Sequence, residues 1–261
     1  MQDDDLLFPD ALENLVNAIE KHPKAYFDSG QIEGVDLDGT ISRSYLSDWS
    51  RYGFFEGIEG HLNTIRLEGP GNLATLFKRA FFDQFGYPHL ALGAHSEHYI
   101  FYLGTCQFPF VTLECPVAIW SGHEGSQSCI GWSPEIFTGG QVLLKDLQEL
   151  YKGLKNERDY REKALPAAKK CVVNHVYYFA KGRLYNGDHK AVDIGYEVLI
   201  KDFSDRKKAI LLKLLMCLFK YIPYFSKVYF ALRKKRQKSV KTKKINFAAK
   251  YPQYRDLIDF D

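Results

Sequence analysis

The chain has 261 residues, of which 46% are hydrophobic, and its formal net charge is only +3. This composition excludes a wholly disordered chain and a generally basic one, and the length fits one large domain or two small ones. The cysteines are odd in number and form no CxxC pair, which argues against a disulfide framework or a zinc-finger spacing and favours a reducing cytoplasm.

The first segment places three carboxylates, Asp3, Asp4 and Asp5, directly before the apolar residues 6–8 and Pro9. Three adjacent carboxylates repel one another, and a divalent cation would remove that cost. Hard oxygen ligands of this kind suit Mg²⁺ or Mn²⁺. A solvated, frayed acidic terminus is the alternative interpretation.

A helix is predicted to begin at Pro9 and to end before Pro23, since proline suits a first helical turn and interrupts an interior one. Residues 25–27 then predict a buried strand, residues 28–30 a turn, and residues 32–37 a second short strand. The apolar residues of the helix share one face at the expected spacing: Leu12, Leu15, Val16 and Ile19.

The middle of the chain is rich in aromatic side chains. Residues 41–68 are predicted to form either core or the wall of a ligand cleft. Residues 72–77 predict a strand, and residues 78–86 predict one or two helical turns closed by a glycine C-cap. A helix follows residues 95–98, and residues 108–119 predict a strand with two proline interruptions.

The C-terminal part is predicted to be helical, with amphipathic segments around residues 143–150, 166–182 and 192–203. Residues 206–236 form an apolar and aromatic segment that Lys213 interrupts, which makes it a poor membrane-spanning helix.

Between Arg233 and Lys244 the chain has eight lysines or arginines and no acid. This pattern predicts a helix that lies in the headgroup plane of an anionic membrane surface. A buried helix with a solvated basic tail is the alternative. Nucleic-acid binding is disfavoured, because the aromatic residues are not interleaved with the cations as a base-stacking surface requires.

Four stretches stand in a recognisable order: DDDLLFPDALENLV, GNLATLFKRAFFDQFG, HSEHYIFYL and CPVAIWSGHEGSQS. Over residues 1–130 this order resembles the C-terminal part of family 2 glycosyltransferases, inverting enzymes of the GT-A fold that use nucleotide-sugars. The resemblance implies an α/β fold. Residues 1–140 would form an incomplete GT-A domain that lacks its N-terminal β-α-β half. A helical region over 141–204 and a basic amphipathic region over 205–261 would follow.

The resemblance also implies roles for individual residues. Asp3, Asp4 and Asp5 occupy the positions of the metal-binding motif, with Mg²⁺ or Mn²⁺ as the cofactor. Either Glu97 or His98 occupies the position of the catalytic base. His123 matches a loop histidine that contacts the metal or the diphosphate, and two serines of the same loop match nucleotide-contacting positions. They are Ser126 and Ser128.

The resemblance predicts transfer of a hexose from a nucleotide-sugar donor to a cell-surface polysaccharide or a lipid-linked acceptor, at the cytoplasmic face of the membrane. The half that holds the nucleotide base has no counterpart in the 261 residues. The chain is therefore predicted to be a truncated part of a longer enzyme, a product that needs a separate polypeptide to supply this half, or a degenerate remnant. The alternative is an inactive remnant that serves as a membrane-surface interaction protein.

Overall fold

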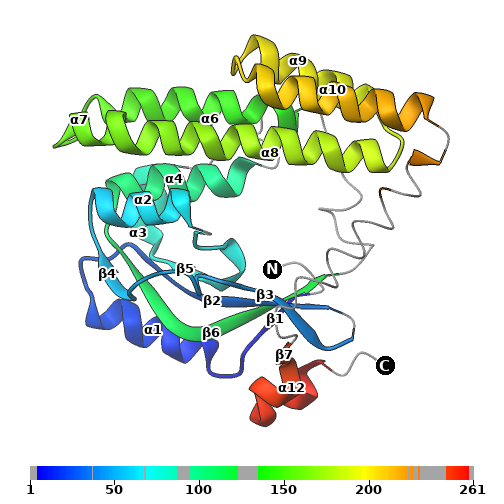
Figure 1. Cartoon of the computed structure of the whole chain (residues 1–261). Coiled ribbons are helices and arrows are strands. Elements are labelled where there is room, and N and C mark those ends of the chain that lie inside the picture. Colours follow the sequence, from blue (N-terminus) through cyan, green and yellow to red (C-terminus); the bar gives the residue numbers. More distant parts are fainter. Residues whose placement is uncertain are drawn as a thin grey trace.

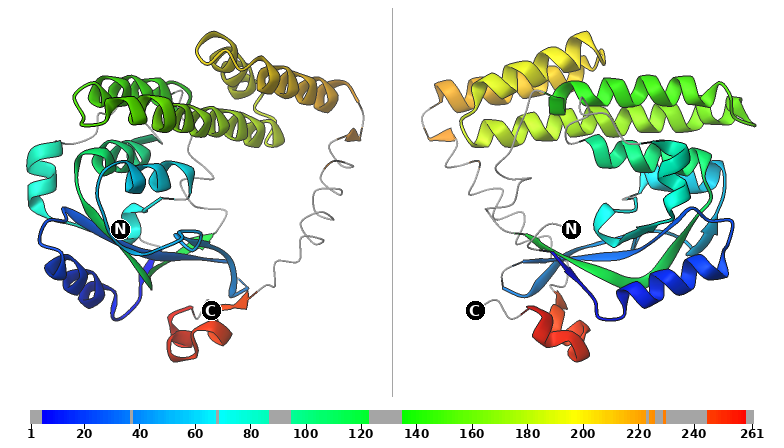
Figure 2. Two further views of the ribbon diagram at one scale, coloured as in Figure 1. Left: turned by 60° about the vertical axis from the view of Figure 1, so that its left-hand side comes forward. Right: turned by 180° about the vertical axis from the view of Figure 1, so that it is seen from behind.

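The computed structural model is a layered α/β protein, which confirms the α/β class predicted from the sequence (Figure 1). A mixed sheet forms the base. Helix α1 lies on one side of it, α2 and α4 lie on the other, and the long helices α6, α8, α9 and α10 stack beyond them (Figures 1 and 2). The structure describes residues 5–36, 38–67, 69–86, 95–122, 135–222, 224–225, 229 and 245–258.

The strands of the described residues join in one sheet with the order β1-β6-β2-β3-β7, while β4 pairs with β6 and β5 pairs with β2. Only the central pair, β2 and β6, is parallel, and the other pairs are antiparallel. The bounds are β1 (Leu6–Leu7), β2 (Phe27–Asp36), β3 (Thr40–Tyr45), β4 (Gly53–Phe55), β5 (Thr75–Phe77), β6 (Phe110–Gly122) and β7 (Ile245–Asn246).

The predicted turn at residues 28–30 was wrong, because these residues lie inside the long strand β2. Partners on both sides, β5 and β6, override the local turn preference of the Asp-Ser-Gly sequence. Gly30 has a packing reason to be there: a Cβ atom at this position would lie 2.1 Å from Val117 Cγ2. The predicted proline interruption of β6 is confirmed at Pro116, where the pairing of β6 with β2 is irregular.

Asp28 is fully buried in this central strand. It lies opposite Leu76 and Val111 of the neighbouring strands. Burial raises the pKa of its carboxyl to about 8, against the weaker opposing effects of a backbone hydrogen bond and the Lys78 charge. Asp28 is therefore a protonated core residue at neutral pH.

The helices beside the sheet are α1 (Ala11–Lys21), α2 (Ile58–Arg66), α3 (Arg79–Phe85) and α4 (Ser96–Gln107), with the short 3-10 helix η1 (Asn72–Ala74). The helix predicted between the first two prolines is confirmed. The glycine C-cap is also confirmed: Gly86 has a φ of 76°, and its N–H donates to Phe82 O at 2.9 Å. The predicted strand over residues 72–77 divides into η1 and β5.

The aromatic middle of the chain supplies core. Trp49 and Phe55 are buried beside Phe27 and Phe110, and the rings of Phe27 and Phe110 stack with centroids 5.1 Å apart. This aromatic cluster lies between the sheet and α3 and α4, and it fixes how α4 crosses the sheet.

The helical layer consists of α6 (Glu135–Tyr151), α7 (Glu157–Asp159), the π-helix η3 (Tyr160–Ala164), α8 (Leu165–Tyr185), α9 (His189–Lys201) and α10 (Arg206–Tyr221). Asp188 and Asp205 cap α9 and α10 by accepting backbone N–H bonds at 3.0 and 2.9 Å. Pro223 was predicted to kink or divide the helical segment 206–236, and α10 does end at Tyr221, because the residue before a proline is disfavoured in the helical conformation.

The end of the described chain returns to the sheet as β7, α12 (Phe247–Lys250) and the 3-10 helix η4 (Pro252–Ile258). The fully buried carboxylate of Glu33 accepts hydrogen bonds from Tyr251 Oη at 2.6 Å, Lys250 Nζ at 2.7 Å and Ser44 Oγ at 2.5 Å. A buried carboxylate satisfied in this way ties the C-terminal segment to β2.

Candidate functional site

The first turn of α4 carries Glu97, one of the two candidates for the catalytic base. Glu97 lies in that turn, and its Oε1 accepts a hydrogen bond from the backbone N–H of Asn72 at 2.7 Å. Although Glu97 is exposed as a residue, its carboxylate lies against η1. Desolvation there raises the pKa of Glu97 above its usual range, and the bond from Asn72 opposes that shift. A carboxylate with a raised pKa is a stronger proton acceptor.

The position of the Glu97 carboxylate over the sheet follows from its closeness to Gly71, which packs against Ile32 of β2. A Cβ atom at Gly71 would lie 2.6 Å from Ile32 Cδ1 and 3.5 Å from Glu97 Oε1. Ile32 is opposite Ala118 of β6, which is itself opposite Leu7 of β1. Glu97 therefore lies above the row of the sheet that contains Leu7, the last residue of β1.

The acidic triplet leads into this row. Asp5 directly precedes β1 and is buried, with 7% of its surface exposed. Asp3 and Asp4 lie outside the described residues, and so do three residues predicted to contact the metal or the nucleotide, His123, Ser126 and Ser128. Of the predicted site residues, the structure describes Asp5, Glu97 and His98, and Glu97 lies above the row that contains Leu7, two residues after Asp5.

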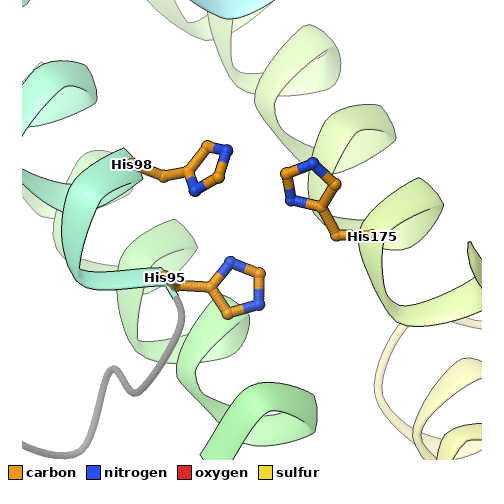
Figure 3. Close-up of side chains that lie close together, drawn as sticks. All are labelled: His95, His98 and His175. Atoms are coloured by element: carbon orange, nitrogen blue, oxygen red, sulfur yellow. The ribbon is translucent and has the colours of Figure 1, made fainter. Parts of the chain in front are cut away.

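The two candidates for the catalytic base face different parts of the molecule. Successive helical residues are turned by about 100° from one another, since the helix has about 3.6 residues per turn. While Glu97 faces η1, His98 points toward His175 on α8 (Figure 3).

His98 belongs to a cluster of imidazoles that also contains His95 and His175 (Figure 3). His95 directly precedes α4, and His98 follows three residues later, so both lie on one face of the first turn. The ring centroids of His98 and His175 are 4.5 Å apart, and each of these rings is 5.9 Å from His95. One ring nitrogen of each residue lies within 4.8 Å of the other two.

The cluster is enclosed but reachable. His95 is buried, with 3% of its surface exposed, whereas His98 and His175 are half-buried. Desolvation by burial lowers the pKa of His175, so it disfavours protonation of this imidazole. On α6, a Cβ atom at Gly140 would lie 3.5 Å from His95 Nε2, so the backbone of α6 closes one side of the cluster.

One helical turn further, a second contact joins the same two helices. Tyr102 of α4 donates a hydrogen bond to Cys171 Sγ of α8 at 3.1 Å. Burial raises the pKa of both groups, most strongly that of Tyr102, so both stay protonated at neutral pH. Cys171 is therefore a thiol and not a thiolate in this position.

Another buried histidine, His61 of α2, provides a reference. Its Nδ1 lies 3.0 Å from Thr105 Oγ1, and its Nε2 lies 2.5 Å from Tyr151 Oη. Thr105 donates its own hydroxyl to Phe101 O at 2.6 Å, so it accepts from His61 Nδ1–H, and Nε2 accepts from Tyr151. Burial lowers the pKa of His61 to about 3. Both ring nitrogens are used, and the residue is structural.

Sequence reasoning missed His95 and His175 as site residues and considered His98 only as a base. The spacing of His95 and His98 at i, i+3 at a helix start was a usable signal, since it puts two imidazoles on one face. Nothing local in the sequence connects His175 to them, because it lies on a different helix.

In the comparisons with known proteins, no family model and no curated sequence matches this chain. The function is therefore argued from the residues and their arrangement.

Proposed function

We propose that the chain carries the metal and acceptor side of a glycosyl-transfer centre, of the type to which residues 1–130 bear a resemblance. The donor would be a nucleotide-sugar, and a hexose would pass to a cell-surface polysaccharide or a lipid-linked acceptor. The observation that carries the proposal is Glu97. A carboxylate with a raised pKa stands at a helix start, above the row of the sheet that contains Leu7, two residues after Asp5.

The chemistry assigns Glu97 the role of base. Inversion at an anomeric carbon is a single displacement, which requires one group to take the proton of the acceptor hydroxyl. Glu97 is held by a single backbone hydrogen bond on Oε1 and is exposed enough to reach an acceptor. His98 turns toward α8 and is assigned no part in this step.

The acidic triplet fits a hard divalent cation by donor type. The buried carboxylate of Asp5 is an oxygen ligand of the kind that Mg²⁺ and Mn²⁺ prefer, and Asp3 would share that role. Such a cation, when bound, neutralises the charge of the departing nucleoside diphosphate. The predicted separate polypeptide would hold the nucleotide base.

The test is Glu97→Gln, which keeps an amide oxygen for the Asn72 N–H but removes the base. We expect hexose transfer to fall by about 10²–10⁴-fold, the usual contribution of a general base. Binding of a nucleoside diphosphate in the presence of Mn²⁺, measured by calorimetry, should stay unchanged. Asp5→Asn should instead weaken that Mn²⁺-dependent binding.

Glu20→Gln is the matched control, because Glu20 is an exposed acid on α1, away from this region. This variant should change neither the rate of hexose transfer nor the Mn²⁺-dependent binding of a nucleoside diphosphate. Nucleoside diphosphate binding that is the same with and without Mn²⁺ would contradict the metal role of the triplet. Undiminished transfer by Glu97→Gln would contradict the role of the base.

A second role, attachment to an anionic membrane surface, is favoured by α10. No helix in the described part of the chain is long and apolar enough to cross a membrane. Yet α10 exposes large apolar side chains, with Ile210, Leu211 and Leu214 showing 55%, 46% and 56% of their surface. The helix contains no acid, and its cations are Arg206, Lys207, Lys208, Lys213 and Lys220. We infer that this face rests on anionic headgroups.

Leu214→Glu tests this role, since the side chain is exposed and its replacement leaves the core intact. We expect it to abolish pelleting of the chain with vesicles that contain phosphatidylserine, and we expect salt to weaken pelleting of the unmodified chain. Leu12→Glu is the control, because Leu12 is 62% exposed on the distant helix α1. Equal pelleting of both variants would refute the assignment to α10.

A further inference from the structure

We propose that His95, His98 and His175 bind one Zn²⁺ ion between α4 and α8, with the fourth coordination position open to water. This site is separate from the predicted site for Mg²⁺ or Mn²⁺ at the acidic triplet, and it does not depend on the glycosyl-transfer proposal.

The first argument is geometric. The three imidazoles come from two different helices and converge on one point (Figure 3). Their nitrogens lie within 4.8 Å of one another. In a tetrahedral zinc site with Zn–N distances of about 2.0–2.1 Å, the ligand nitrogens are about 3.4 Å apart. A bound ion would draw the three nitrogens closer together than they are without it.

The second argument is the donor set. Three neutral nitrogen ligands without a carboxylate select a borderline transition metal such as Zn²⁺ and disfavour Mg²⁺ and Mn²⁺. Three protein ligands leave one position for water, as in open zinc sites. The half-buried state of His98 and His175 leaves that position accessible, while buried His95 forms the closed end.

The third argument is the contrast with His61. There, each ring nitrogen is directed at a hydroxyl that completes it, at 3.0 and 2.5 Å. In the trihistidine cluster, one nitrogen of each ring lies within 4.8 Å of a nitrogen of each of the other two rings. Packing of aromatic rings explains why three imidazoles touch, but it does not explain why their nitrogens gather at one point.

The ion would have a structural consequence for the candidate site. His95 and His98 flank Glu97 in the first turn of α4, while His175 lies in the middle of α8. A zinc ion bound by all three would join the helical layer to the turn that holds Glu97. It would act as a positioning element and not as a participant in the proton transfer.

The experiment uses the full chain purified without a polyhistidine tag and stripped of metal by a chelator. Zinc is titrated by calorimetry, and bound zinc is counted by elemental analysis after gel filtration. We expect one tightly bound Zn²⁺ per chain and a rise in the melting temperature on its addition. His175→Ala should lose that ion, with an affinity at least about 100-fold weaker, since loss of even an outer-shell partner costs 10–100-fold.

His189→Ala is the matched control, because His189 is exposed at the start of α9 and should leave zinc binding unchanged. Circular dichroism of His175→Ala checks that the variant folds, and His98→Gln provides a second, more conservative test. Substitution by Co²⁺ should give the visible band of a tetrahedral ion without a sulfur charge-transfer band, which excludes Cys171 as a ligand.

Equal zinc stoichiometry and melting shift for the unmodified chain and for folded His175→Ala would overturn the proposal. Failure of the unmodified chain to bind zinc would do the same. Neither result bears on Mn²⁺-dependent binding of a nucleoside diphosphate, so the two proposals fail independently.

Discussion

Histidine side chains contact α4 near both of its ends, a single residue at one end and a cluster of three at the other, and they use their ring nitrogens in different ways. Near the end of the helix, Thr105 holds Nδ1 of His61, and Tyr151 completes the other nitrogen. At the start of the helix, His95 and His98 turn their rings toward His175. Both groups lie where α4 meets the helical layer.

The difference teaches how to separate a structural histidine from a ligating one. A buried polar group that is fully hydrogen-bonded stabilises a single packing arrangement, and it has no lone pair left to bind a ligand. The fully buried His61 is of this kind, and its pKa near 3 keeps it neutral in all ordinary conditions. Imidazoles that converge and remain half-exposed suit an ion that arrives from solvent.

The largest expected effect concerns stability. His61→Ala removes a fully buried side chain and leaves the hydroxyls of Tyr151 and Thr105 without their partner. We expect the free energy of unfolding to fall by about 3–5 kcal/mol, from the cavity and the unsatisfied groups together. Urea unfolding followed by circular dichroism measures it.

His175→Ala is the comparison at the other end of α4. Because His175 is only half-buried, we expect a loss of about 1 kcal/mol in metal-free buffer. Saturating zinc should increase the difference in unfolding free energy between this variant and the unmodified chain, because a ligand at 100 times its Kd stabilises the native state by about 2.7 kcal/mol. Equal losses for the two variants, with or without zinc, would erase the distinction between the clusters.

Much of the fold follows from local patterns. The helix that became α1 and the C-cap at Gly86 depend on periodicity, end residues and a glycine at positive φ, all of which are local. Helix α4 begins at Ser96, within the residues 95–98 that were predicted to precede it. The turn wrongly predicted at residues 28–30 shows the limit. Its residues favour a turn, but the flanking strands β5 and β6 determine the outcome.

The return of the C-terminal segment also depends on tertiary structure. Glu33 and Tyr251 are far apart in the chain, and neither carries a local sign that they form a hydrogen bond in the core. A basic stretch from Arg233 to Lys244 leads into this segment and gives no hint of a β-strand at Ile245.

The candidate site was predicted in part. Glu97 follows from its place at a helix start together with the family resemblance, but the bond from Asn72 that holds it could not be read from the sequence. The trihistidine cluster needed the packing of α4 on α8, because only that packing brings His175 to His95 and His98.

The smallest expected effect is that of Tyr102→Phe, which is compared with the same substitution at Tyr151 of α6. Tyr151→Phe removes the hydroxyl that donates to His61 Nε2, and it leaves a buried nitrogen unsatisfied, at a cost of about 1–3 kcal/mol. Tyr102→Phe removes a hydroxyl that donates only to the sulfur of Cys171, a weak acceptor, and should cost less than about 1 kcal/mol. Urea unfolding of both variants measures the difference, and zinc titration of Tyr102→Phe should still give one ion per chain, because Tyr102 supports the neighbourhood of His98 without supplying a ligand. If Tyr102→Phe proved the more destabilising change, the hydrogen bond between Tyr102 and Cys171 would be the stronger of the two, which would contradict this ranking.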